Sequence, residues 1–592
     1  MDNQKRLLLA IALSFGLTLV WSKFFYEPNH QAEIAAAEAA AAGALDAGVA
    51  VAPGTTPPAG SETMVAAAET DGGVAAPAPA PAAPAREVLV DRASTHFTFQ
   101  SVGAGLSHAV LQGAKEHVQP EVSLVEGWKR LFGAPKPALE PMDLAVPVPG
   151  RPLPLSLSIG GAVPVPAELA WTVAEASESK VVFTAQSGPW RLKKTFEWGA
   201  EPYEPKLTVE AAVESQVPVA GELVLHAVRG IDPAKEQAPS MFGGVGNQSI
   251  ALCHVGDDVE RVRPNEDPPV TKKGQLGFFG IDQQYFLTAL YPLGGQREGS
   301  CTMTANKTVR AIDAAFPFVA EAGKPAVLAF GIFMGPKDLE LLGKVAAGAG
   351  PGAAATTSAN YPALGRAVDF GIWAAICKVM LPTLKFFFGL MGNWGLAIIA
   401  LTVLVKVLLL PLTHKAMVSA EAMKKLAPRM EEIKKKYPDD RERQNLETMK
   451  LYQEAKVNPL GGCLPLLLQI PVWGALFTTL RNSYELYGEP FVGPVWVDLT
   501  YKDPTYLLPL ALGITMIITQ RAQPQMMDAA QAKIMTWFMP IFFTAIMMNY
   551  PAGLALYIFT NNLLSIAQQQ LLKRYLARKA EAVDGKPQAS GA

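Results

Sequence analysis

The pattern of hydrophobic and polar positions changes several times along the chain, and each change predicts a different kind of structure. Five apolar runs lie in the C-terminal part, at 394–413, 460–480, 505–520, 534–550 and 553–571. Each is close to the ~20 residues that a bilayer core requires. Another run follows Lys5 and Arg6, and bulky residues come after it where a cleavable signal has small ones. We therefore predict a polytopic α-helical membrane protein with six spans, of which 1–26 is an uncleaved anchor.

Between residues 86 and 350 the period shortens to that of β-strands. Runs such as KVVFTA and ELVLHAV are punctuated by Gly and Pro, and no helical period is sustained. This texture predicts a large all-β sandwich. No catalytic triad, metal-ligand set or phosphate loop stands out there, so we interpret the domain as a binding or scaffolding module. The Ala- and Pro-rich segment 27–85 before it predicts a semi-rigid linker.

Residues 351–392 begin with a second low-complexity linker. In the apolar part that follows, Lys378 and Lys385 lie seven residues apart among aromatic residues and Leu. This spacing predicts an amphipathic helix in the membrane interface rather than a span. Span 2 follows at 393–413, and spans 3–6 occupy 460–572.

Residues 414–459 predict a cytoplasmic helical hairpin of coiled-coil type. Met423, Leu426, Met430 and Ile433 recur at spacings of three and four, a Pro-Asp-Asp turn follows, and Leu446 and Met449 continue the apolar stripe. The basic residues that we single out for docking are Lys424, Lys425, Arg429, Lys434, Lys435 and Lys436. Two interpretations stay open: a solvated face, or a docking arm for an anionic partner such as ribosomal RNA or lipid headgroups.

The formal net charge of −2 conceals an asymmetry that predicts orientation. Basic residues gather at 414–456 and in the tail 573–592, whereas the loop 482–504 leans acidic. Because cytoplasmic loops carry the excess of Lys and Arg, both termini are predicted to be cytoplasmic and the β domain extracytoplasmic. The four cysteines show no metal-ligand spacing. Cys253 and Cys301 could form a disulfide, and two unpaired buried thiols are an equal alternative.

Lys406 is a charge well inside the second span. At ~1.5 Å per residue it lies ~18 Å from Trp394, in the inner half of the bilayer. Either it snorkels to the cytoplasmic headgroups, or it faces a water-filled cavity. Thr402 precedes it by one turn, Gln469 has a similar depth by the same count, and Asn562 adds another polar group. Together these residues predict a polar groove that opens inward.

The segments GNWGLAIIALTVLVKVLLLPLT, KVNPLGGCLPLLLQIPVWGALF and FMPIFFTAIMMNYPAGLALYIFTNN resemble the YidC/Oxa/Alb membrane protein insertases. The N-terminal anchor and the β domain with FFGIDQQYFLTALYP look like the long form found in the inner membrane of Gram-negative bacteria. The resemblance implies an insertase and chaperone without a chemical reaction or cofactor, working alone or with the Sec translocon. The partners that it implies are nascent membrane proteins, that translocon, the ribosome at the hairpin and basic tail, and lipids.

The resemblance also implies roles for residues. The family has a five-helix core with a hydrophilic groove and one basic residue, commonly Arg, which Lys406 matches here. Lysine keeps the charge and loses the planar fork of donors, so charge and hydration are what the site is expected to need. An aromatic pair often found in the last span is Tyr557-Ile558 here, which leaves Tyr557 as the candidate substrate contact.

Two other classes of protein remain as alternatives. A secondary transporter could use Lys406 as a substrate or proton site, but no inverted repeat and no paired carboxylate is visible in the spans. An intramembrane enzyme would need a Ser/His pair, an Asp pair or an H-E-x-x-H motif at membrane depth. None is seen in the sequence of the predicted spans.

Overall fold

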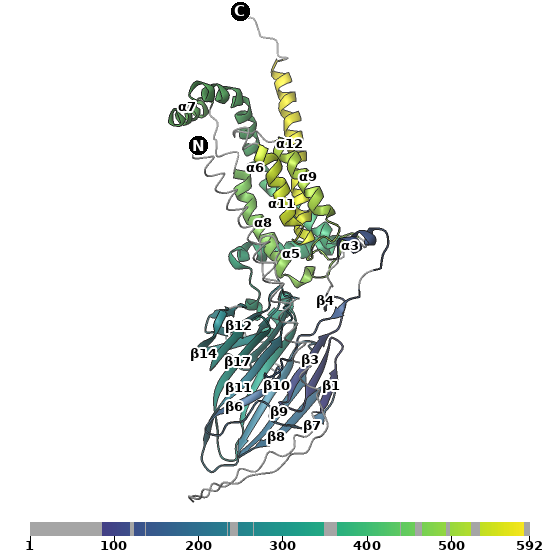
Figure 1. Ribbon diagram of the computed structural model, residues 1–592, viewed down its shortest axis with the longest axis vertical. Coiled ribbons are helices and arrows are strands. Elements are labelled where there is room, and N and C mark those ends of the chain that lie inside the picture. The colour runs from purple at the N-terminus through teal and green to yellow at the C-terminus, as the bar shows by residue number, and fades with distance from the viewer. Residues whose placement is uncertain are drawn as a thin grey trace, which may run out of the picture. The chain divides into compact units, whose positions relative to one another are not determined.

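The computed structural model of the chain describes residues 86–118, 123–135, 138–233, 235–236, 247–264, 266–347, 364–438, 440–455, 464–492, 496, 498–522 and 533–584. The predicted N-terminal anchor and the 27–85 linker lie outside these residues. The second low-complexity stretch also falls largely outside them. The described parts form a sheet-rich domain and a set of helices (Figure 1).

One antiparallel sheet of 13 strands dominates the β domain. Its strands are β6 (Leu157–Gly161), β7 (Thr172–Ala176), β8 (Lys180–Ser187), β9 (Trp190–Trp198), β10 (Pro205–Val213), β11 (Val219–Gly230), β12 (Ile250–Val255), β13 (Asp258–Val262), β14 (Glu266–Asp282), β15 (Phe286–Pro292), β16 (Arg297–Ala305), β17 (Val309–Ala320) and β18 (Ala326–Pro336). The main path runs β6-β11-β17-β16-β14-β15-β18-β10-β9-β8-β7, and β12 and β13 lie off it. A three-stranded sheet holds β1 (Glu87–Asp91), β2 (Thr95–Gln100) and β3 (Gly105–Leu111), and β4 (His117–Val118) pairs with β5 (Glu140–Pro141).

Aromatic contacts show that the large sheet folds over on itself. Strands β17 and β18 are separated by β16, β14 and β15 in the sheet order, yet the rings of Phe316 and Phe330 lie 5.1 Å apart. Neighbouring strands are ~4.8 Å apart, so a flat sheet could not bring these rings together. The small sheet packs against the β9 region, where Phe99 lies 4.7 Å from Phe196. The sheet-rich domain is thus confirmed, and its layers are one curved sheet plus a small one.

The helices are α3 (Leu124–Leu131), α4 (Leu339–Ala347), α5 (Ala374–Met391), α6 (Trp394–Lys436), α7 (Arg441–Glu454), α8 (Leu464–Asn482), α9 (Leu507–Ala522), α11 (Met539–Met547) and α12 (Ala552–Asp584). A π-helical segment, Ile534–Phe538, leads into α11. Within the described residues, Gly371–Met391 and Trp394–His414 are long and apolar enough to cross a membrane, and Leu507–Arg521 and Ile534–Met547 are shorter apolar helices. A helical core is therefore present. The interfacial position of 371–391 stays a prediction, because length and composition alone would also allow a span.

The helix that begins at Trp394 does not end near 413, where span 2 was predicted to end. Asn393 caps its start by accepting a hydrogen bond from the Leu396 N–H at 3.0 Å. The helix then continues through Pro411 and Pro428 to Lys436. Span and hairpin arm are consequently one helix of 43 residues.

The hairpin is present, but its second arm presents a different face from the one predicted. Met423 and Met430 of α6 are buried together with Leu451 and Tyr452 of α7. Leu446 and Met449, which were expected to continue the stripe, are about half exposed. The prediction was wrong for these two because it extended the α6 spacing across the turn. Asp440, which caps α7 by accepting from the Arg443 N–H at 2.9 Å, restarts the helical phase.

Helix α3 was not predicted, although its local signals are present in the sequence. The Ser123 hydroxyl accepts from the Glu126 N–H at 3.3 Å, and the Glu126 carboxylate accepts from the Ser123 N–H at 3.2 Å. This reciprocal pair is a capping box, which starts a helix without tertiary help. Gly133 follows its end with a positive φ of 91°. The alternating texture around this segment concealed these signals.

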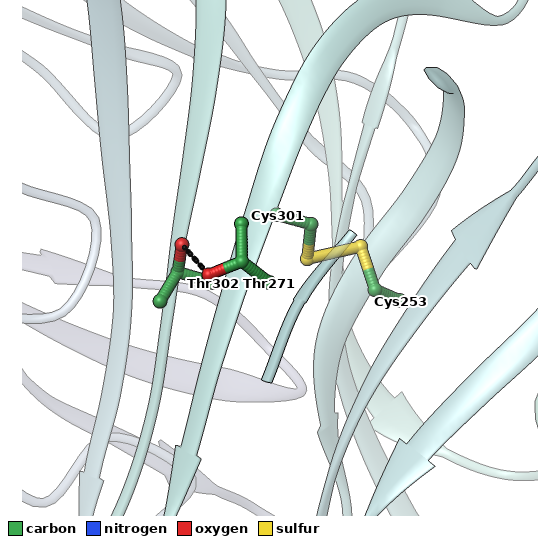
Figure 2. The surroundings of a disulfide bond; sticks show 4 residues. All are labelled: Cys253, Thr271, Cys301 and Thr302. Carbon is green, nitrogen blue, oxygen red and sulfur yellow. Dashed lines mark hydrogen bonds between the residues drawn. A yellow bond between two sulfur atoms is a disulfide. The ribbon is translucent and has the colours of Figure 1, made fainter. Parts of the chain in front are cut away.

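Cys253 of β12 and Cys301 of β16 form a disulfide (Figure 2). Both strands border β14, and both cysteines are fully buried. Beside the disulfide, the hydroxyls of Thr271 and Thr302 lie 3.0 Å apart across the β14–β16 pair. Of the two alternatives left open by the sequence, the structure has the bonded one. Cys377 is a free buried thiol.

The loop between α8 and α9 contacts the β domain, and both belong to one compact unit. The ring of Tyr487 stacks on Tyr285 with centroids 4.5 Å apart, and its hydroxyl donates to the His117 carbonyl at 2.8 Å. The Lys115 ammonium lies 2.7 Å from the Glu489 carboxylate. Aromatic stacking, a hydrogen bond and an ion pair thus attach this loop to the sheet.

Candidate functional site

The polar residues predicted in the spans meet along one helix, α12. We call Tyr557, Asn562, Ser565 and Gln568 the α12 stripe. At 100° per residue these four positions lie within one side of the helix. Each makes a side-chain contact with another helix, and the partners come from α6, α8 and α9. The site is therefore best described as a row of cross-helix polar pairs.

Lys406 is half-buried, and its ammonium donates to the Ser565 hydroxyl at 2.8 Å. Ser565 in turn donates to the Asn561 carbonyl one turn earlier at 2.8 Å. A serine hydroxyl is neutral, so this pair satisfies one donor of the ammonium without neutralising its charge. Among the described residues Lys406 has no carboxylate partner.

Thr402 does not share the surroundings of Lys406, although it lies one turn away. Its side chain is 1% exposed, and its hydroxyl donates to the Ile398 carbonyl at 2.7 Å. Such back-bonding satisfies a hydroxyl inside its own helix. Thr402 therefore packs against neighbouring helices, and this structure does not present it to a groove.

Gln469 pairs with Tyr557, since its amide donates to the tyrosine hydroxyl. Tyr557 is 2% exposed, so the candidate substrate contact is buried and engaged here. Gln469 and Lys406 were expected to share a depth. Their partners on α12, Tyr557 and Ser565, are eight residues apart, which is ~12 Å along a helix. The two residues thus contact different levels of the α12 stripe.

Two further pairs complete the row. The Asn562 amide lies 3.5 Å from the Thr515 hydroxyl of α9, at the long limit for a hydrogen bond. The Gln568 amide donates to the Thr413 hydroxyl of α6 at 3.0 Å. Ser565, Thr515 and Thr413 were not singled out from the sequence. The spacing of Asn561, Ser565 and Gln568 was the available signal, but small hydroxyls in apolar runs usually only bond their own helix.

The predicted docking residues lie on the hairpin arm of α6. Lys425, Arg429, Lys435 and Lys436 are exposed, Lys434 is half-buried, and the side chain of Lys424 lies outside the described residues. In the tail, Lys573 and Arg574 are exposed as well. Lys436 and Arg443 both lie over the Tyr437 ring, at 5.5 and 5.4 Å from its centroid. The last turn of α6 is therefore basic, and acidic residues lie on both sides of it in the sequence.

The β domain holds a Ser-His-Asp triple that the sequence did not suggest. The Ser158 hydroxyl is 3.0 Å from His226 Nε2, and His226 Nδ1 is 2.7 Å from the Asp313 carboxylate. Acyl transfer also needs backbone donors for an oxyanion beside the nucleophile. Here the N–H of Ile159, the next residue, donates to the Val165 carbonyl at 3.0 Å. His226 and Asp313 are direct cross-strand partners. We therefore interpret the three side chains as a structural hydrogen-bond network that links β6, β11 and β17.

Comparisons with known proteins agree with the two-part organisation. The family model described as "60Kd inner membrane protein" matches residues 386–579, and the one described as "YidC periplasmic domain" matches residues 141–382. Within the described ranges, no group of three or more His, Cys, Asp or Glu side chains could hold a metal ion. The matched segments cover the 13-stranded sheet and the helices that carry Lys406 and the α12 stripe.

Relatives extend the match over nearly the whole chain. A membrane protein insertase YidC of Anaeromyxobacter dehalogenans (strain 2CP-1) is 39% identical over 445 residues, which are 73% of this chain and 78% of the relative. One from Syntrophus aciditrophicus (strain SB) is 30% identical over 96% of this chain and 99% of its own length. A crystal structure of an active YidC insertase aligns with 81% of this chain and 91% of its own, with 18% identity and a TM-score of 0.34. This chain belongs to the YidC family of membrane protein insertases.

Proposed function

We propose that this chain moves nascent spans and short polar flanks from the cytoplasm into the inner membrane through a hydrophilic groove, and acts there as a chaperone. The observation that carries the proposal is the contact of Lys406 with Ser565 at 2.8 Å. Among the described residues, the ammonium of Lys406 has a neutral hydroxyl as its one polar partner, so it keeps an unmet demand for water or for an anionic group. A polar or acidic client flank meets that demand.

The α12 stripe offers the rest of the path. Its pairs join uncharged groups or a charge to a hydroxyl, and such hydrogen bonds contribute only ~1 kcal/mol each. A client's backbone and polar side chains can therefore replace them one at a time, with Lys406, Gln469, Asn562 and Tyr557 as successive partners. Thr402 supports the helix packing behind Lys406. Because each hydrogen bond of the stripe is replaced by a similar one to the client, the free-energy barrier to the passage of a polar flank stays low.

Energy for the transfer comes from the client. No nucleotide-binding motif occurs in the sequence, and the mechanism needs neither a chemical step nor a cofactor. The apolar segment leaves between helices into lipid and gains roughly 25 cal/mol per Å² of apolar surface removed from water. The membrane potential adds up to ~2.3 kcal/mol per 100 mV for each charge moved fully across.

The topology that supports this mechanism has six spans, with both termini in the cytoplasm and the β domain in the periplasm. In it, the basic hairpin around Lys425, Arg429 and Lys436 and the tail after Lys573 face the ribosome and the inner lipid headgroups. In this topology the chain works alone or beside the Sec translocon. The positive charge of the hairpin supports this side, because excess Lys and Arg remain cytoplasmic.

An insertion assay in cells depleted of the native insertase tests the proposal. With expression levels matched, Lys406→Arg should retain insertion of clients with acidic flanks. Lys406→Leu should lower it about tenfold or more, and Lys406→Glu should lower it further, because Glu repels the flank. Lys533→Leu, at an exposed lysine outside both the hairpin and the α12 stripe, is the matched control for loss of a charge.

Equal insertion by the parent and by the Leu and Glu variants would remove Lys406 from the mechanism and leave snorkelling as its role. A transporter would give another result: insertion of small membrane proteins would not depend on the chain at all.

A further inference from the structure

We propose that the apolar side of α3 binds the outer surface of the membrane, with lipid as its partner. The side chains concerned are Leu124, Val125, Trp128 and Phe132, which we call the α3 stripe. Their exposed fractions are 47%, 59%, 38% and 86%. Positions 124 and 128 of α3, and 132 directly after its last residue, repeat every four residues, so the stripe follows one side of the helix and its C-terminal end. The inference goes beyond insertion and takes only the side of the membrane from the proposed topology.

Local hydrogen bonds hold both ends of α3. The Ser123–Glu126 capping box forms the first turn, and the Phe132 N–H donates to the Lys129 carbonyl at 3.0 Å in the last. Local bonds of this kind usually supplement the burial of an apolar face. Here the apolar face is left uncovered by the described residues, which is the arrangement of a helix that lies in a membrane interface.

A close backbone contact fixes where the stripe lies. Gly127 is a buried position of α3, and a Cβ added there would be 2.3 Å from the Pro504 carbonyl oxygen. Pro504 stands just before α9, and the preceding Asp503 accepts the Leu508 N–H at 2.8 Å to cap that helix. Helix α3 therefore lies against the residues that begin an apolar helix of the core.

The same level marks the start of a second core helix. The Ala552 N–H, at the first residue of α12, donates to the Tyr501 carbonyl at 2.7 Å. In the proposed topology α9 and α12 both begin at the outer surface, so the residues around 501–504 lie at the outer headgroups. Tryptophan favours that depth, and the exposed Lys129 beside it can reach anionic headgroups. A helix that lies at the depth of the outer headgroups is surrounded by lipid, so lipid is the partner of the α3 stripe.

Spin-label accessibility in the full chain tests the proposal. The protein is reconstituted into vesicles of phosphatidylethanolamine and phosphatidylglycerol, with Cys377→Ser and Cys463→Ser and with the buried disulfide kept. Labels are attached at Val125→Cys and at Phe132→Cys. The matched control is Val217→Cys, which is 64% exposed against 59% for Val125. Val217 follows the last residue of β10, a strand of 9 residues that spans ~30 Å.

The expected result is a ratio of oxygen to nickel-chelate accessibility at least tenfold higher at 125 and 132 than at 217. A ratio equal to that of the control would mean that the stripe faces water, and would overturn the proposal. Low accessibility to both reagents would mean that a protein covers the stripe, and would overturn it too. Each labelled variant must keep the parent's melting temperature. No client is present in this measurement, so its failure is distinguishable from a failure of insertion.

Discussion

Lys406 and Thr402 lie one turn apart on α6, and their polar atoms have different partners. The ammonium of Lys406 reaches across to α12, whereas the hydroxyl of Thr402 bonds its own helix and is buried. Sequence spacing places both residues on one side of the helix, but it cannot say which of them a neighbouring helix covers. The sequence shows that Lys406 is charged, but only the packing of α6 against α12 shows that Ser565 is its partner.

Cysteine labelling from the cytoplasmic side separates the two environments. A cysteine at Thr402 should stay inert to a water-soluble maleimide, because that side chain is 1% exposed. A cysteine at Gln469, which is half-buried and whose amide contacts Tyr557 of the α12 stripe, should react if the proposed groove is hydrated. Lys425→Cys is the labelled control. An inert cysteine at 469 beside a labelled one at 425 would contradict a hydrated groove.

Lys194 is a buried charge outside the membrane part. Its ammonium donates to the carbonyls of Ala104, at 2.8 Å, and of Leu155, and it lies 5.2 Å from the centre of the Phe196 ring. Burial lowers the pKa of Lys194 to about 7. Lys194 thus links the small sheet to the large one, and burial of its ammonium makes the charged form less favourable.

The pKa of Lys194 predicts a pH dependence of stability. Because the folded pKa lies below the unfolded one, the unfolded chain binds more protons between pH 7 and pH 10, and stability rises with pH there. The rise is at most about 4 kcal/mol. Lys194→Met should flatten this slope in the melting temperature of the β-domain transition. Lys193→Met, at an exposed neighbour paired with Glu210 at 2.8 Å, should keep it. An unchanged slope in Lys194→Met would assign the dependence to another group.

At the scale of elements, the period of the pattern predicted helices and strands well and their partners poorly. The alternation of β10, whose residues are buried at every second position, identifies a half-buried strand. It cannot show that β17 meets β18 through curvature of one sheet, because curvature depends on side chains far apart in the sequence. Helix α3 was not predicted because its signal in the sequence is a capping box rather than a hydrophobic period. The buried face of α7 was predicted wrongly because the Asp440 cap starts a new helix with its own phase.

The disulfide between β12 and β16 is an element-scale constraint that can be removed. The loop it closes spans 48 residues, for which the chain-entropy account gives about 4 kcal/mol. The double variant Cys253→Ser/Cys301→Ser should therefore lower the β-domain melting temperature by roughly 10 °C. Scanning calorimetry of the full chain in detergent measures it. A reductant should lower the melting temperature of the parent protein by a similar amount and leave that of the double variant unchanged. A parent that melts at one temperature with and without reductant would contradict this.

For the whole molecule, the attachment of the α8–α9 loop to the β domain depends on few groups. Tyr487 contributes both the stack on Tyr285 and the hydrogen bond to His117. Tyr487→Ala should weaken this attachment by ~2 kcal/mol, and hydrogen exchange of residues 484–491 should speed up about thirtyfold. Tyr487→Phe, which keeps the ring, should show a smaller change. Tyr575→Ala, at an exposed tyrosine of α12, is the control. Parent-like exchange in Tyr487→Ala would mean that other contacts hold the loop.

The unbroken length of α6 has a mechanical consequence. Its first residue is held fast, since Trp394 stacks on Phe388 at 4.4 Å, and its last turn is the basic tip of the hairpin. A rod of this kind, ~64 Å long at 1.5 Å per residue, acts as a lever about its anchored end. If the helix moves as a straight rod, a sideways displacement of ~7 Å at Lys436 moves the turn of Lys406 by ~2 Å, and a kink at Pro411 or Pro428 would reduce this motion. A load placed on the tip is therefore transmitted along one continuous helix to the level of Lys406.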